Sequence, residues 1–411
     1  MVEYELTSSV TATASPPASR PPHVLDTKLP ANRSARHPAR RESLRQRFRV
    51  AFGPGAFLGM SFGDWLDFVR DNHFQIDRPY WWRSLLISLN SLSNSPLRLF
   101  EERVLEPKVQ AMTVVPPLFI LGHARSGTTY LYNMLALDPR FASPNVYEAY
   151  YPHTFLSTEG IFARIIAAFL PRNRPMDAVA LRISAPAEDE WAHCIATGLS
   201  PYMRYIAPRR AAHYDRYMTF RDVPPQETAR WKRAFLLFLK KLTWKYQKPL
   251  VLKSPPHTCR LRLLLEMFPD ARFIHIHRNP YHVFQSTRHL NRLALRSFTL
   301  QRTPADVDER IVQAYQQMYD SFFAERHLIP AGRLHDLSFE RLEKDPKGEV
   351  RAIYEALDLP SFAQFERPLE RYIESLINYR KNQFPEVASR LRTRLRREWH
   401  RNFEEWGYSL S

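Results

Sequence analysis

Cysteines and long apolar runs are scarce in this sequence. The 411 residues include two cysteines, Cys194 and Cys259, which are too few for a disulfide framework or a cysteine-rich metal site and favour a reducing compartment. No apolar run reaches the ~18–20 residues of a membrane span, and Ile161–Leu170 is too short and contains an arginine. Glu3 and Glu5 stand where a secretory signal carries positive charge. We therefore expect a cytoplasmic protein, soluble or peripheral to a membrane.

Acidic residues are outnumbered by basic ones. Lys and Arg total 59 and Asp and Glu total 42, which gives a net charge of +17. Such a surplus indicates an anionic partner: nucleic acid, a membrane surface or a phosphorylated small molecule. A basic, solvated surface would give the same count, so charge alone does not choose between them. Hydrophobic residues make up 44% of the chain, enough for the core of one large domain or two modest ones.

The composition divides the chain into three parts. Residues 1–45 are rich in Ser, Pro, Ala and Arg and are expected to form a flexible tail. Residues 46–115 carry apolar and aromatic residues at helical spacing, with a break at Pro79, and predict a helical N-terminal extension. In this extension we expect Trp81 and Trp82 to pack against the main domain, with docking on a membrane as the alternative. Residues 116–411 form the predicted main domain.

Strand-like and helix-like segments alternate in the main domain. Four short apolar segments are each followed by a helical pattern: Leu118–Gly122, Pro249–Lys253, Ala271–Arg278 and Arg333–Phe339. This alternation predicts a three-layer α/β/α fold, in which helices cover both faces of a central parallel sheet. Residues 140–248 interrupt the alternation and are predicted to be a mostly helical insertion. Ligands of such sheets bind at the carboxyl ends of the strands.

The stretch GHARSGTT, Gly122–Thr129, follows the first predicted strand and has the glycine spacing of a phosphate-binding loop. A nucleotide triphosphatase needs lysine where this sequence has Thr128, because that lysine reaches the β- and γ-phosphates. Backbone N–H groups and a helix N-terminus favour an anion at such a loop, and Arg125 supplies a cation within it. The loop therefore indicates a site for a compact anion such as a nucleotide 5′-phosphate.

A second motif follows the third predicted strand. Arg278 ends this strand, an Asn-Pro pair comes next, and Ser286 lies eight residues after the arginine. That interval spans a helix N-terminus and about two turns, so both side chains can lie on one side and bind a phosphate. The same stretch holds three histidines that have no carboxylate or cysteine spaced with them. We interpret them as packing residues and expect no metal: His275, His277 and His282.

The two motifs together resemble those of the sulfotransferases that use 3′-phosphoadenosine 5′-phosphosulfate (PAPS). Family members carry Lys or Arg, then Ser or Gly, Gly, Thr and Thr or Ser in the first loop, and Arg, Asx-Pro and a later Ser in the second. The resemblance runs from about residue 60 to the C-terminus, points to the bacterial branch and implies a P-loop-like sulfotransferase fold. It implies that the 5′-phosphosulfate is bound by Arg125, Ser126, Gly127, Thr128 and Thr129, and the 3′-phosphate by Arg278 and Ser286.

The resemblance also suggests which cations act on the donor. Negative charge grows on the oxygen that leaves toward the 5′-phosphate, and cations beside that oxygen stabilise it. Arg125 is the first candidate, and Lys253, which ends the second predicted strand, is the other. Arg380 lies in a basic stretch near the C-terminus and would close over the 3′-phosphate. Asn382 stands where the family has glycine, so a solvated basic helix is an equal interpretation of that stretch.

The acceptor, expected to be a hydroxyl of a small molecule, lipid or carbohydrate, needs a general base. Three residues compete for this role: Glu148, His257 and Glu190. We rank Glu148 and His257 nearly equal, because related sulfotransferases carry a catalytic glutamate or histidine in the corresponding regions. Glu190 ranks behind them, since Glu188 and Asp189 adjoin it and indicate a solvated acidic patch.

Two other functions compete with sulfuryl transfer from PAPS. A nucleotide-binding kinase or triphosphatase of the P-loop type would share the loop, but this sequence lacks its lysine at position 128. A basic, non-enzymatic binder of membranes or nucleic acid would explain the charge, although no recognised nucleic-acid-binding motif is present. We therefore expect an enzyme with PAPS as co-substrate, no metal, a small-molecule or lipid acceptor and no nucleic acid partner.

Overall fold

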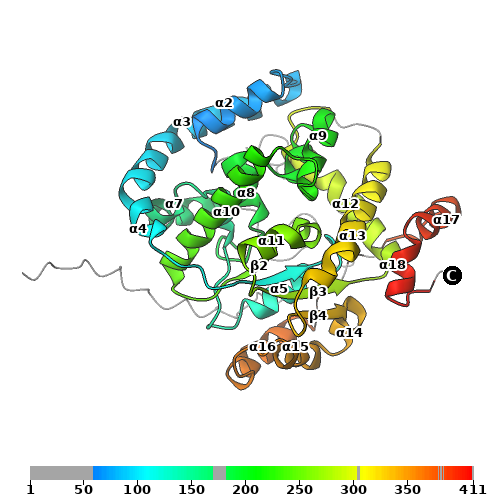
Figure 1. Ribbon diagram of the computed structural model, residues 1–411. Coiled ribbons are helices and arrows are strands. Elements are labelled where there is room, and N and C mark those ends of the chain that lie inside the picture. The colour runs from blue at the N-terminus through cyan, green and yellow to red at the C-terminus, as the bar shows by residue number, and fades with distance from the viewer. Residues whose placement is uncertain are drawn as a thin grey trace, which may run out of the picture.

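A computed structural model describes residues 59–169, 182–302, 306–377, 379, 382 and 384–409. Its centre is a sheet of four parallel strands in the order β2-β1-β3-β4, around which the helices pack (Figure 1). The strands are β1 (Leu118–Leu121), β2 (Val251–Lys253), β3 (Arg272–His277) and β4 (Leu334–Ser338). The four predicted strands and the parallel sheet are thereby confirmed.

The sheet separates two apolar cores, because successive strand residues face opposite sides. On one side Phe119 and Leu121 of β1 join the core with the long helices α10 (Pro225–Tyr246) and α13 (Val307–Glu325). On the other side Leu118 and Ile120 join the core with α5 (Thr128–Leu135), α15 (Pro346–Ala356) and α16 (Ala363–Ser375). Every residue of β1 is buried, as expected for a parallel sheet with both faces covered. The predicted three-layer α/β/α fold is confirmed.

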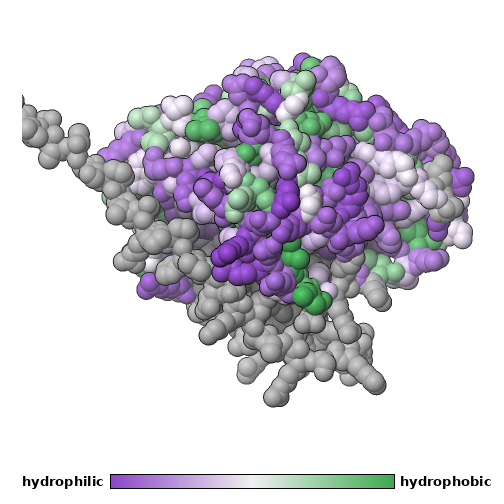
Figure 2. All heavy atoms as spheres, turned by 90° about the horizontal axis from the view of Figure 1, so that it is seen from below, coloured by the Kyte–Doolittle hydropathy of each residue, from purple (hydrophilic) through white to green (hydrophobic). Residues whose placement is uncertain are grey.

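Further helices complete these two layers. On the α10 side lie η7 (Pro255–Cys259), α11 (Leu261–Met267) and α12 (Pro280–Phe298), and on the α5 side lies α14 (Phe339–Lys344). Near the C-terminus follow α17 (Ser389–Glu398) and α18 (His400–Glu405). The face of the molecule seen from below is largely hydrophilic, with apolar side chains in small separate groups (Figure 2).

The described part of the N-terminal extension is helical. It contains α2 (Phe62–Asp71), the short 3-10 turn η2 (Arg78–Tyr80), α3 (Trp81–Phe100), the π-helical turn η3 (Glu101–Leu105) and α4 (Glu106–Gln110). The predicted tail, residues 1–45, lies outside the described residues. The expectation that Trp81 and Trp82 pack against the main domain is wrong, because 59% and 51% of these side chains are exposed.

Helices also fill the described residues between 140 and 248. They are α6 (Val146–Tyr150), α7 (Phe155–Phe169), α8 (Glu190–Thr197), η4 (Pro201–Tyr205), η5 (Pro208–Arg210), α9 (Ala211–Asp215), η6 (Arg216–Met218) and α10. Ala142 forms an isolated parallel bridge with Leu250 just before β2. The segment therefore returns to the sheet at β2, where it contributes residues to the carboxyl ends of the strands.

Candidate active site

The loop between β1 and α5 depends on two glycines. Gly122 has φ +136° and Gly127 has φ +102°, a backbone region that favours glycine. A Cβ atom at position 122 would lie 2.4 Å from the carbonyl oxygen of Ile276, and one at position 127 would lie 2.3 Å from Cδ2 of Phe339. Because the loop is wedged between β3 and Phe339, it turns tightly at the carboxyl end of the central strand β1.

Some polar groups of the loop are used within the protein. The N–H of Gly122 donates to Thr258 Oγ1 at 2.8 Å, and the buried Ser126 hydroxyl donates to the His123 carbonyl at 2.7 Å. The first N–H groups of a helix have no intrahelical acceptor. At the start of α5 these belong to Thr128 and Thr129, so the positive end of the helix and two N–H groups are directed at one place.

The two predicted phosphate motifs meet in space. Arg125 Nε donates to Ser286 Oγ on α12 at 2.8 Å, and Arg278 Nη1 lies 3.4 Å from the Arg125 carbonyl oxygen. The Arg278 guanidinium lies over the Phe339 ring, 4.3 Å from its centroid. Residues 153 and 161 positions apart in the chain thus form one cationic group beside the loop.

Arg278 has the properties of an anion-binding residue. Burial lowers the pKa of its guanidinium, and its buried Nε has no hydrogen-bond partner within the described residues. A guanidinium presents donors in a planar fork that matches a phosphate. Arg278, Arg125 and the hydroxyl of Ser286 therefore suit a phosphate group beside β3.

Lys253 connects the loop to the helical segment before β2. Its ammonium lies 3.3 Å from Thr129 Oγ1 and 2.5 Å from Glu188 Oε1, and only 3% of its side chain is exposed. Lys253 pairs in register with Ile120 of β1, which places this cation at the same sheet edge as the loop. A carboxylate and a cation thus lie side by side next to Thr129.

Three consecutive acidic residues at the start of α8 have three different partners. Glu188 contacts Lys253, as described. Asp189 Oδ2 lies 2.7 Å from His257 Nε2. Glu190 forms a fully buried ion pair with Arg260, at 2.7 Å from Nη1 and 3.0 Å from Nη2. The acidic run is therefore not a solvated patch, and each carboxylate contacts its own residue of the 253–260 segment.

The predicted base His257 is fully buried beside Asp189. Ser254 Oγ also donates to Asp189, at 2.9 Å. Burial by itself would raise the pKa of Asp189, but His257, His193 and the hydrogen bond from Ser254 outweigh it and lower that pKa to about 2. His257 Nδ1 is buried and has no hydrogen-bond partner among the described residues. Asp189 thus joins the imidazole of His257 and the hydroxyl of Ser254, the residue after Lys253, in one buried network.

Glu148, the other leading candidate base, lies in a separate cluster. It forms a capping box with Asn145 at the start of α6 and is fully buried. Its Oε1 accepts from Lys245 Nζ at 2.5 Å and from the Tyr246 hydroxyl at 2.6 Å. Burial raises the pKa of Glu148, although Lys245 opposes this shift. The structure brings Glu148 to α10 and not to Lys253 or the loop.

Glu188 is the residue that sequence reasoning missed. Its side chain is 23% exposed, and its second oxygen, Oε2, accepts from the Tyr202 hydroxyl at 2.5 Å. Tyr202 also contacts Trp191, which stacks on Tyr150. The sequence offered one signal for Glu188, an acidic residue directly before a helix that returns to the sheet. The sequence does not, however, distinguish Glu188 from its two acidic neighbours.

Two of the three histidines noted in the sequence, His275 and His277, lie on β3, the strand that pairs with β1 beside the loop. His275 Nδ1 lies 2.9 Å from Asp336 Oδ1 of the neighbouring strand β4, and His277 stacks on Trp406. The carboxylate partner is thus present, but it comes from a strand that is paired in space and not close in sequence. Within the residues that the structure describes, no group of three or more His, Cys, Asp or Glu side chains is placed to bind a metal. The remaining site candidate, Arg380, lies outside the described residues.

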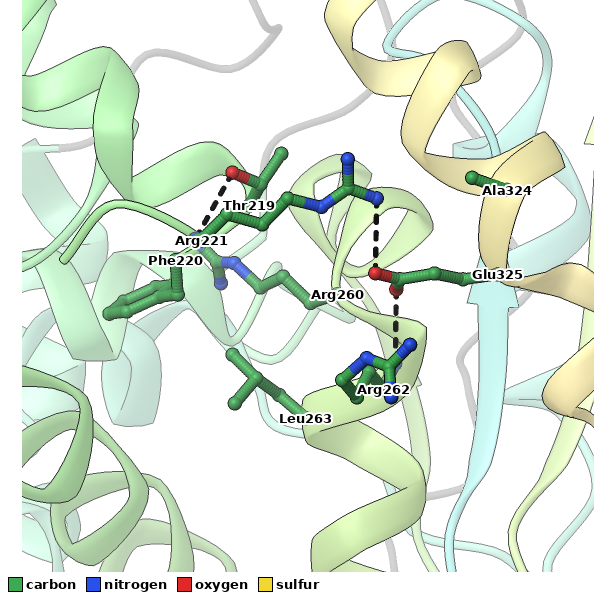
Figure 3. A pocket seen from close by; sticks show the side chains of 8 residues that line it. All are labelled: Thr219, Phe220, Arg221, Arg260, Arg262, Leu263, Ala324 and Glu325. Carbon is green, nitrogen blue, oxygen red and sulfur yellow. Dashed lines mark hydrogen bonds and ion pairs between the residues drawn. The ribbon is translucent and has the colours of Figure 1, made fainter. Parts of the chain in front are cut away.

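A pocket of about 440 Å³ lies elsewhere, between η6, α11 and the end of α13 (Figure 3). The Glu325 carboxylate accepts two hydrogen bonds there: one from Arg221 Nη2 to Oε1 at 3.1 Å, and one from the backbone N–H of Arg262 to Oε2 at 3.2 Å. None of the predicted site residues lines it. This pocket is therefore separate from the loop and from Lys253.

The comparisons with known proteins agree with this geometry. Residues 116–364 match the family model described as "Sulfotransferase family". Two curated relatives, the omega-hydroxy-beta-dihydromenaquinone-9 sulfotransferases Stf3 of Mycobacterium bovis and Mycobacterium tuberculosis, are each 34% identical over 355 residues, which cover 86% of this chain and 91% of theirs.

Two solved structures share the fold. Sulfotransferase STF1 from Mycobacterium tuberculosis has a TM-score of 0.60 at 18% identity, over 76% of this chain and 86% of that one. STF9 from Mycobacterium avium has a TM-score of 0.58 at 20% identity, over 84% and 96% of the two chains. The resemblance noted in the sequence is confirmed: the chain belongs to the sulfotransferase family.

Proposed function

We propose that this sulfotransferase moves the sulfuryl group of PAPS to the hydroxyl of a lipid alcohol. The observation that carries the choice of donor is the contact between Arg125 and Ser286, with Arg278 beside them. This contact places a loop suited to a 5′-phosphate beside a cationic group suited to a second phosphate. A donor with phosphates at both the 5′ and 3′ positions matches that pair of sites.

In this proposal each motif binds one end of the donor. Thr128 and Thr129 offer N–H and hydroxyl donors to the 5′-phosphosulfate at the start of α5, with Arg125 as the nearby cation. Ser126 supports the loop through its bond to His123 and does not contact the ligand through its hydroxyl. Arg278 and Ser286 bind the 3′-phosphate. A P-loop kinase or triphosphatase, considered from the sequence, would need the lysine that Thr128 replaces.

The chemical step is an in-line displacement at sulfur. The acceptor oxygen forms a bond to sulfur, while the bond from sulfur to the 5′-phosphate oxygen breaks and its electron pair stays on that oxygen. Lys253 and Arg125 stabilise this growing charge. The hydroxyl proton moves to Glu188, the carboxylate that lies next to Lys253. The products are the sulfated acceptor and 3′,5′-adenosine bisphosphate.

Glu188 is preferred as the base over the three candidates from the sequence. It is partly exposed and contacts the cation at the loop, whereas Glu148 and Glu190 are fully buried and paired with Lys245 and Arg260. His257 is buried against Asp189. We assign His257 the role of a positioning residue that holds the segment after Lys253.

A lipid acceptor is favoured by the relatives and by the surroundings of Glu188. The curated relatives are named for sulfation of an omega-hydroxy-dihydromenaquinone. In this chain the aromatic rings of Tyr202, Trp191, Tyr150 and Phe298 form a half-buried cluster at Glu188, with neighbouring centroids 4.9–5.5 Å apart. Such rings suit an apolar chain that carries a terminal hydroxyl.

Calorimetric titration with 3′,5′-adenosine bisphosphate tests the donor site. Arg278→Ala removes charge-assisted hydrogen bonds that contribute roughly 1.5–3 kcal/mol each, so the affinity should fall about tenfold to a hundredfold. The control is Arg292→Ala, an exposed arginine on the same helix as Ser286, which should bind normally. Unchanged affinity in Arg278→Ala would contradict the assignment, and tight binding of ATP with magnesium in place of the bisphosphate would contradict the donor.

A further inference from the structure

The helix α3 turns apolar side chains outward. Seven large apolar residues on it are between 47% and 59% exposed: Trp81, Trp82, Leu85, Leu89, Leu92, Leu99 and Phe100. Their spacing, at intervals of one, three, four and seven residues, places them on one face of the helix. We call these seven residues the apolar face of α3.

The opposite face of α3 is packed inward and carries mainly polar side chains, together with Ile87, which joins the core. Arg83 is buried and donates to the Thr299 carbonyl at 2.7 Å, and Ser88 accepts from the Trp65 indole at 2.8 Å. The buried residues of this helix also include Asn94. A surface helix of a soluble protein normally does the reverse and turns its apolar face to the core. Because polar contacts fix this orientation, the apolar face is left for another partner.

The apolar face lies on the periphery of the molecule. α2 and α3 follow its outer edge, away from the sheet (Figure 1). The N–H of Ser157 donates to Glu101 Oε1 at 2.7 Å, which holds α7 beside the end of α3, and α7 adds the exposed Ile161 and Phe162. The face seen from below shows no comparable run of apolar side chains among its described residues, only small groups between hydrophilic ones (Figure 2).

The composition of this face suits a bilayer surface. Trp81 and Trp82 begin the helix, and tryptophan prefers the boundary between lipid and water. A helix with one apolar and one polar face lies in the plane of that boundary. No helix of the described residues is long and apolar enough to cross a membrane.

The charge nearby complements anionic lipid. Arg78, Arg103 and Lys108 are exposed next to α3. Basic residues beside an amphipathic helix are attracted to anionic headgroups. A second copy of this protein would carry the same positive charge, which disfavours pairing of two such faces.

A chain of contacts leads from this region to the proposed base. The backbone at Gly59, which precedes α2, packs closely against Tyr150. Tyr150 stacks on Trp191, Trp191 contacts Tyr202, and the Tyr202 hydroxyl donates to Glu188. The aromatic cluster thus lies between the N-terminal helices and the strand ends, where a lipid alcohol would reach Glu188.

We propose that the apolar face of α3 docks on an anionic lipid bilayer and presents the enzyme to an acceptor held in the membrane. The docking surface follows from α3 itself, while the choice of a lipid acceptor rests on the proposed function.

Vesicle flotation tests the docking. The vesicles are phosphatidylcholine, with or without phosphatidylserine, and the variant is the triple change Leu85→Gln, Leu89→Gln and Leu92→Gln. Wild type should float with the vesicles that contain phosphatidylserine. It should bind vesicles of phosphatidylcholine alone at least about tenfold more weakly. The variant should lose about a hundredfold or more of the binding. Ile377→Gln, which changes a residue outside α3 that is 77% exposed, should bind as wild type.

Two further measurements separate the outcomes. Thermal melting should be the same for the triple variant and wild type, because the changed side chains are exposed. Turnover with PAPS and a short water-soluble alcohol should also be unchanged, while turnover with a long-chain alcohol in vesicles should fall. Flotation without any sulfuryl transfer would support docking and contradict only the proposed function. Failure of wild type to float, or a dimer that the triple change dissociates, would overturn the docking.

Discussion

At the scale of single residues, Glu188 differs from the other carboxylates near the strand ends by its partners. Glu190 and Arg260 form a fully buried pair, and removal of one partner of such a pair costs about 3–5 kcal/mol of stability because the other charge stays buried. Glu188 shares its two oxygens between Lys253 and Tyr202 and remains partly exposed. In the proposed function, Glu188 thus serves the chemistry, and the adjacent Glu190 contributes to stability.

The change Glu188→Gln tests this division. It removes the proposed proton acceptor, so kcat should fall by about 10²–10⁴-fold, with little change in bisphosphate affinity. Glu148→Gln serves as the comparison and should keep its turnover once the folded fraction is measured by thermal melting. Full activity of Glu188→Gln would place the base elsewhere.

At the scale of elements, the loop from β1 to α5 is sensitive to any side chain at Gly127. Gly127→Ala introduces strain at φ +102° and a contact with Phe339 at 2.3 Å, which together cost about 1–3 kcal/mol or more. The unfolding free energy and the bisphosphate affinity should both fall. Gly332→Ala is the matched control, because Gly332 has φ +76° with open space around it and should lose only stability. Normal binding by Gly127→Ala would show that the loop does not hold the donor.

The positions of the strands were more predictable from the sequence than the contacts that their side chains make in space. The four strands are short apolar runs between turn residues, and each was predicted to within two residues of its bounds. The meeting of Asp336 with His275 depends on the pairing of β3 with β4, which linear spacing does not contain. The orientation of α3 was also hidden, because helical spacing does not reveal that Arg83 finds its partner in the core. Glu188 was missed for the same reason.

At the scale of the whole molecule, buried histidines set the pH dependence of stability. Burial lowers the pKa of His123 to about 4, of His193 to about 3 and of His277 to about 4. The unfolded chain protonates these residues below about 6.5, whereas the folded protein keeps them neutral. Their contribution is therefore complete above about pH 6.5 and is lost as the pH falls toward 4.

Denaturant unfolding between pH 7 and pH 4 measures this loss, which should amount to several kcal/mol, at about 1.4 kcal/mol for each unit of pKa shift. The variant His193→Phe should show a smaller loss, because His193 packs against Trp231 and Phe235 and a phenyl ring fits there without titrating. A flat stability profile across this range would contradict the neutral, buried state of these histidines.

The pairing of residues 188–190 with residues 253–260 constrains how acceptor specificity can be exchanged between relatives. The helical segment that carries the aromatic cluster meets the sheet through Lys253, His257 and Arg260 in a fixed register. A chimaera that imports this segment with its acidic run displaced by one residue would leave Arg260 buried without its carboxylate. Such chimaeras should therefore fold only when residues 188–190 and residues 253–260 are exchanged together.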